Sequence, residues 1–159
     1  MNFFKKIEKE IIEKGFKIIS KDFERPWGGF LVIDESQAQD FANTFFDGIN
    51  VETLKIGGKL SPKILIVSPN SKLSWQYHHR RAEIWRVFKG KVGVSRSFDD
   101  LEKPVKILNE KDQIKLKLTN ATLSYRLSSQ VMFQLKSLVD YNSEDFLNPR
   151  LALKYRYDF

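Results

Sequence analysis

The spacing of apolar residues predicts two helices near the N-terminus. Four of them recur at intervals of three to four through residues 2–14: Phe4, Ile7, Ile11 and Ile12. Gly15 follows where a helix often ends. Residues 36–39 (Ser-Gln-Ala-Gln) match a capping box, which would open a second amphipathic helix that Gly48 ends.

Short β-rich runs separated by turn residues occupy the chain from about residue 60. We expect strands at residues 63–67, 73–78, 84–88, 92–97, 105–108, 113–118, 122–127 and 131–138. An earlier apolar run, 30–33, follows a turn-rich stretch at 25–29. Strands this short and regularly spaced are typical of an antiparallel sandwich or barrel.

The domain organisation follows from the absence of internal repeats and linkers. We expect one domain over residues 1–159. Its parts would be N-terminal helices and lead-in strands over 1–50, a barrel core over 51–140 and a C-terminal tail over 141–159, which is either a final strand or a loose end.

Composition narrows the class of protein. The chain is 42% hydrophobic and 30% charged, which excludes a disordered chain or a coiled coil. It has no cysteine, so disulfides, thiol catalysis and thiolate metal sites are excluded. No apolar run approaches the ~20 residues of a membrane span, and the N-terminus lacks the core of a signal peptide. We therefore expect a cytoplasmic protein with no membrane partner.

The formal net charge is +7, and this raises the question of nucleic-acid binding. Nucleic-acid binders concentrate basic residues on one face. Here the basic residues are spread from Lys5 to Arg156 with acidic residues between them. We expect no nucleic-acid partner, and interpret the charge as a solvated surface or a basic cleft for a small anion.

Candidate chemistry is concentrated between residues 69 and 90. Strand alternation predicts Gln76 and His78 on one face and Leu73 and Trp75 on the other. Glu83 opens the next strand after a short turn. The bend would bring an amide oxygen, an imidazole and a carboxylate together, and these are ligands for zinc, manganese or iron. A polar pocket without metal is the alternative.

The same stretch resembles the first motif of the cupin superfamily, which reads glycine, five residues, His-x-His, four residues, Glu, six residues, glycine. The matching positions are Asn70, Gln76, His78, Glu83 and Gly90. Glutamine at the first histidine, with Arg-Ala-Glu-Ile-Trp at 81–85 and Arg-Pro-Trp-Gly at 25–28, is similar to the type II mannose-6-phosphate isomerase branch. The resemblance covers residues 16 to about 138. It implies an all-β cupin fold (a double-stranded β-helix, or jelly-roll barrel) with N-terminal helices.

This resemblance implies a metal-dependent aldose–ketose isomerase that acts on a sugar phosphate. Its metal, with zinc the first choice and manganese or iron the alternatives, would be held by Gln76, His78 and Glu83. The metal would stabilise the developing oxyanion while a separate group moves the proton. The resemblance also implies a homodimer.

Basic residues are the further site candidates. Arg81 and Lys63 are the candidate catalytic residues, and Arg25 is a candidate for substrate binding, because cations neutralise phosphate or an enediolate. Arg81 could instead form a surface salt bridge, and Arg25 could simply belong to a tight turn. Trp75 and Trp85 are expected in the core.

The second cupin motif is not matched. The family pattern has a Pro-x-Gly turn and a histidine before Arg-Leu, whereas residues 119–127 place Tyr125 at the histidine position. Tyr125 is a candidate substrate-binding hydroxyl or a plain strand aromatic; a phenol ligates metal only when deprotonated, and its reference pKa is about 10. The only histidines are His78 and His79. The alternative function is therefore a non-catalytic cupin that binds a sugar phosphate or nucleotide sugar.

Overall fold

The computed structural model describes residues 3–54, 59–77, 83–97, 104–116 and 122–138, with side chains except at 74–77, 96–97, 116 and 122–138. The N-terminal part contains α1 (Phe3–Glu13), β1 (Ile18–Arg25), β2 (Gly28–Ile33), the 3-10 turn η1 (Glu35–Gln37), α2 (Ala38–Phe45) and the 3-10 turn η2 (Val51–Thr53). The strands that follow are β3 (Lys59–Val67), β4 (Ser71–Tyr77), β5 (Glu83–Ser97), β6 (Lys106–Leu108), β7 (Gln113–Leu116) and β8 (Thr122–Leu138). In the described parts of the chain, no helix has the length and apolar character needed to cross a membrane.

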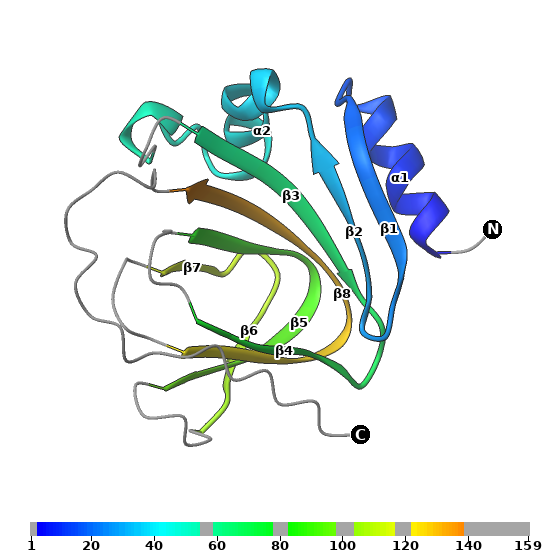
Figure 1. Cartoon of the computed structure of the whole chain (residues 1–159), viewed down its shortest axis with the longest axis vertical. Helices are drawn as coiled ribbons and strands as arrows, with labels where there is room; N and C mark the ends of the chain where they lie inside the picture. Colours follow the sequence, from blue (N-terminus) through cyan, green and yellow to red (C-terminus); the bar gives the residue numbers. More distant parts are fainter. Residues whose placement is uncertain (1–2, 55–58, 78–82, 98–103, 117–121, 139–159) are drawn as a thin grey trace, which may run out of the picture.

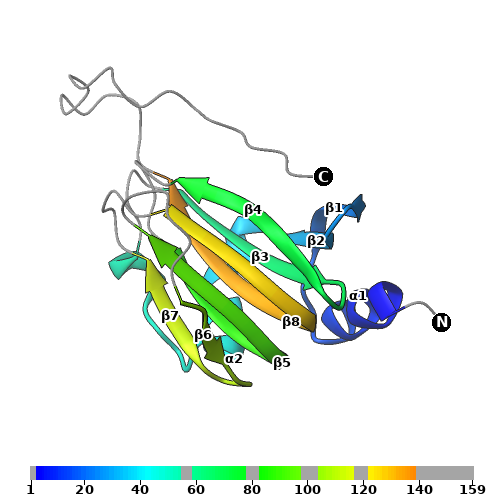
Figure 2. The same ribbon diagram turned by 90° about the horizontal axis from the view of Figure 1, so that it is seen from below.

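The strands form one antiparallel sheet that folds over on itself. β5 and β8 pair along most of their lengths, and each has different outer partners on its two halves. The first half of β8 pairs with β4 and its second half with β3; the first half of β5 pairs with β7 and its second half with β6. One layer, called the upper layer below, is therefore β1-β2-β3-β8-β5-β7, and the other is β4-β8-β5-β6. β5 and β8 curve from one layer into the other (Figure 1), and Figure 2 shows the same sheet from below.

The curve in β5 is centred on Gly90. The register between β5 and β8 shifts twice between Val87 and Lys91, and Gly90 has a φ of 85°. A β-bulge of this kind bends a strand and increases its twist. The Gly90 N–H is satisfied by the carboxylate of Glu110, at 2.8 Å, from the turn after β6.

This bend corrects two strand predictions. The expected pair 84–88 and 92–97 is the single strand β5, because Lys89-Gly90 bends the chain without reversing it. In the same way, the expected strands 122–127 and 131–138 are the single strand β8. The expected tail strand at 154–159 lies outside the described residues.

The N-terminal predictions are confirmed for the first helix and wrong in one detail of the second. Gly15 ends α1 with a φ of 87°, and its N–H donates to the carbonyl of Ile12 at 2.9 Å. The expected capping box does not form: Ser36 donates to Asp34, which caps η1 ahead of α2. The side chain of Gln39 instead accepts from Val51 N–H in the next loop.

The upper layer lies between two hydrophobic cores. The helix-side core joins α1 and α2 to one face of β2 and β3, and includes Ile7, Ile11, Leu31, Phe41, Phe45, Ile64 and Ile66. The inner core lies on the opposite face of β3, between the layers, and consists of Leu65, Val67, Leu73, Trp85, Val87, Val92, Val94 and Leu108. β3 is thus buried on both faces. Along this strand, residues that face the space between the layers alternate with residues that pack against the helices.

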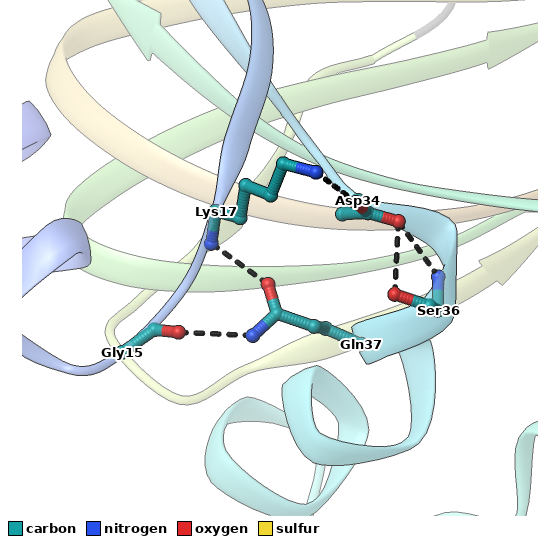
Figure 3. Close-up of polar contacts among 5 residues, drawn as sticks. All are labelled: Gly15, Lys17, Asp34, Ser36 and Gln37. Atoms are coloured by element: carbon teal, nitrogen blue, oxygen red, sulfur yellow. Dashed lines mark hydrogen bonds and ion pairs between the residues drawn. The ribbon is translucent and has the colours of Figure 1, made fainter.

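A polar network joins the segment between α1 and β1 to the segment before α2 (Figure 3). The Gln37 side chain accepts from Lys17 N–H at 2.7 Å and donates to the Gly15 carbonyl at 2.9 Å. Asp34 accepts from Ser36 N–H and pairs with the Lys17 ammonium at 3.1 Å. The backbone hydrogen bond from Ser36, and next the contact with Lys17, lower the pKa of Asp34 below the ordinary value.

This lowered pKa predicts a pH-dependent contribution to stability. The ionised Asp34 is favoured in the folded state, so its contribution is present above the ordinary aspartate pKa of about 4 and is lost as the pH falls further. We expect Asp34→Asn to be less stable than the wild type at pH 7, with the difference shrinking at pH 3. Urea unfolding at both pH values measures this, and an equal difference at both would contradict it.

Candidate functional site

Glu83 is the first residue of β5. It lies on the face of the upper layer that carries the inner core, which we call the inner face. Trp85 and Val87, at the next alternate positions, belong to the inner core. Ile84 belongs to the helix-side core, and Arg86 forms an ion pair with Asp47 just after α2. Because successive strand residues point to opposite faces, this alternation places the Glu83 carboxylate between the two layers.

The Glu83 carboxylate is buried and held by its neighbour. Only 2% of Glu83 is exposed. The indole N–H of Trp85 donates to Glu83 Oε2 at 2.8 Å. A carboxylate is rarely buried unless it is paired or coordinates an ion, so this burial keeps Glu83 as a candidate site residue.

Lys63 lies on the same inner face, two strands away. It alternates with Leu65 and Val67 of the inner core. Ser61, one alternate position earlier, shares with Glu83 the β8 partner Lys136. Two strand spacings separate Ser61 and Glu83, which is about 10 Å between Cα atoms. Lys63 is therefore close to the Glu83 end of the inner face.

Arg25 lies on a different strand of the sheet from Glu83. It ends β1, and β2, β3 and β8 lie between β1 and β5. Its guanidinium pairs with Asp22 at 2.7 Å and lies 5.8 Å from the ring centroid of Phe30. The Lys63 ammonium is 5.6 Å from the same ring. The structure thus brings Arg25 and Lys63 together around Phe30, and does not bring Arg25 to Glu83.

The register of β4 corrects the predicted faces of the first motif. Leu73 pairs with Tyr125 of β8 and Gln76 pairs with Leu123, so three steps along β4 match two along β8. A bulge between them therefore returns Gln76 to the face of Leu73, where uninterrupted alternation predicts opposite faces. Since Leu73 belongs to the inner core, the register position of Gln76 is on the inner face.

Two candidate site residues lie outside the described residues: His78 and Arg81. Tyr125 is described by its backbone, which pairs with Leu73 and Val94, both members of the inner core. Of the three predicted metal ligands, only Glu83 has a described side chain. Within the described ranges no three His, Cys, Asp or Glu side chains are grouped as a metal cluster.

The structure adds two residues to which sequence reasoning gave no site role. Trp85 is in the core, as expected, and it also binds Glu83. Its position two residues after Glu83 was the available signal, because such residues share a strand face. Phe30 joins Arg25 to Lys63 through strands that are distant in sequence, and no local signal predicts this.

Comparisons with known proteins give the family. A model of the mannose-6-phosphate isomerase C-terminal family matches residues 48–135, which is more than half of the chain. No curated protein matches this chain significantly.

Among solved structures, KdgF from Halomonas sp. is 10% identical with a TM-score of 0.52, and the match covers 77% of this chain and 88% of KdgF. Vicilin from tomato, Solanum lycopersicum, is 15% identical with a TM-score of 0.50, and the match covers 79% of this chain and 31% of vicilin. A protein from Bacillus halodurans is 10% identical with a TM-score of 0.46; the match covers 52% of this chain and 64% of that protein, so this chain spans less than two thirds of its length.

The similarities to KdgF and vicilin, with the folded antiparallel sheet and the N-terminal helices, confirm the predicted fold class. The chain belongs to the mannose-6-phosphate isomerase C-terminal family and has the cupin fold.

Proposed function

We propose that this chain is a metal-dependent aldose–ketose isomerase acting on a sugar phosphate of the mannose 6-phosphate type. Membership of a sugar-phosphate-isomerase-like cupin family supports the reaction class. The observation that carries the proposal is the buried carboxylate of Glu83, which enters the space between the layers at the end where β5 begins.

The donor set fits a divalent metal ion. Glu83 supplies a buried carboxylate oxygen, Gln76 an amide oxygen and His78 an imidazole nitrogen, and these types bind zinc, manganese and iron. The inner-face register of Gln76 is consistent with a shared site. We propose these three residues as the ligands. When bound, the metal would act as a Lewis acid toward the sugar oxygens.

The basic residues have separate proposed roles. In the isomerisation a proton leaves C2 and one returns to C1, while the hydroxyl proton of O2 passes to O1, so no atom is gained or lost. Lys63 and Arg81 would neutralise negative charge that develops on the oxygens. Arg25, beside Lys63 at Phe30, would contact the phosphate group, which lies at the far end of the sugar from C1.

Metal analysis and an isomerase assay test the proposal. We expect protein purified without chelator to hold about one equivalent of a transition metal, and a chelator to remove it together with activity. A coupled assay on mannose 6-phosphate, with sedoheptulose 7-phosphate as a second substrate, measures turnover. Less than about a tenth of an equivalent of metal, with no turnover of either sugar, would overturn the proposal.

A specific observation favours a second candidate, a non-catalytic cupin that binds a sugar phosphate or nucleotide sugar. β8 contains no histidine, and Tyr125 lies between Leu73 and Val94 of the inner core. Catalytic zinc normally keeps three good protein ligands, and an amide is the weakest of the three proposed here. Saturable binding of a sugar phosphate by metal-free protein, without turnover, would support this alternative.

A further inference from the structure

Trp85 and Glu83 form a buried pair on the inner face. Each is 2% exposed, and the indole N–H lies 2.8 Å from Glu83 Oε2. A buried indole N–H needs an acceptor. The backbone groups around it are engaged in the sheet, since β5 pairs with β7 on one side and β8 on the other at both positions. Among the described side chains, Glu83 supplies an acceptor for this N–H.

The indole is itself held in place. Trp85 pairs with Ile114 of β7 and packs in the inner core with Val87. A rigid donor that is buried against strands on both sides restricts the rotamers of the carboxylate it binds. A carboxylate held in one orientation loses less conformational freedom when it binds a metal ion.

We propose that Trp85 is a positioning residue that orients Glu83 for a divalent metal ion; this rests on the proposed function. With Oε2 held by the indole N–H, the Glu83 carboxylate would be presented to the metal in a fixed orientation. Partners that orient a metal ligand typically change affinity by about 10–100-fold when they are lost. Trp85 therefore contributes to the strength of the metal site without touching the metal.

Zinc affinity of the metal-free protein, measured by competition with a chromophoric chelator, tests this. We expect Trp85→Phe to bind zinc about 10–100-fold more weakly than the wild type. Trp27→Phe is the matched control, because Trp27 packs against the same core from the turn between β1 and β2; its affinity should change less than about 2-fold. Replacing Trp85 by 3-benzothienylalanine, which keeps the shape and lacks the N–H, should reproduce the Phe result even if Trp85→Phe folds poorly.

The arms of the experiment separate this inference from the proposed function. Wild-type protein that binds no zinc, or Glu83→Gln that binds it as the wild type does, would overturn the proposed metal site and the role of Trp85 with it. Weak binding by Glu83→Gln with normal binding by both Trp85 variants would overturn the positioning role alone. The urea midpoint of each variant, measured in parallel, shows whether lost affinity reflects unfolding.

Discussion

The Gly28→Ala variant is expected to lose at least about 4 kcal/mol of unfolding free energy, or to fail to fold. Gly28 has a φ of 134°, in a region that side-chain-bearing residues rarely adopt. A Cβ there would also lie closer than 3.0 Å to the carbonyl oxygen of Ile66 in β3. Since β2 pairs with β3 at this point, the strand could relieve the overlap only by leaving its partner.

Gly15→Ala is the matched control for this prediction. Gly15 also has a positive φ, of 87°, but nothing lies within 4 Å of a Cβ built on it. Backbone strain alone should therefore lower the unfolding free energy of Gly15→Ala by about 1–2 kcal/mol. Urea unfolding of both variants separates strain from overlap, and equal losses at the two positions would show that the close approach of β3 does not matter.

Much of the fold could be predicted from the sequence because its signals are local. The periodicity of α1 and the glycine after it depend only on neighbouring residues. Asn70 is another local signal. It stands at a position where the cupin motif has glycine, and its φ of 58° is one that asparagine tolerates. Lead-in strands were expected within residues 1–50, but the bounds of β1 were not predicted, because most of its residues are exposed and give no clear alternation of buried and exposed positions.

Features set by pairing across the sheet could not be predicted in this way. A glycine between two apolar runs signals a turn or a bulge equally, and only the partners of β5 decide that Gly90 is a bulge. The face of Gln76 likewise depends on β8. Glu83 was predictable, since its alternation with Trp85 is local, whereas the meeting of Arg25 and Lys63 at Phe30 required three strands to assemble.

Glu83→Gln is expected to show the largest effect on function. The substitution keeps the size of the side chain and an oxygen that can accept from Trp85, so the inner core should remain packed. It removes the negative charge that would hold a divalent ion. Lewis-acid stabilisation is worth several kcal/mol, so kcat/KM on mannose 6-phosphate should fall about 10³-fold, with loss of bound metal.

Glu13→Gln provides the control, because this carboxylate is 64% exposed on α1 and pairs with Lys9 across a single helical turn. Its metal content and kcat/KM should match the wild type, because a surface pair of this kind contributes little. A Glu83→Gln protein that folds, retains its metal and isomerises the sugar at the wild-type rate would contradict the placement of the site. The reaction would then have to take place at a part of the inner face that does not include Glu83.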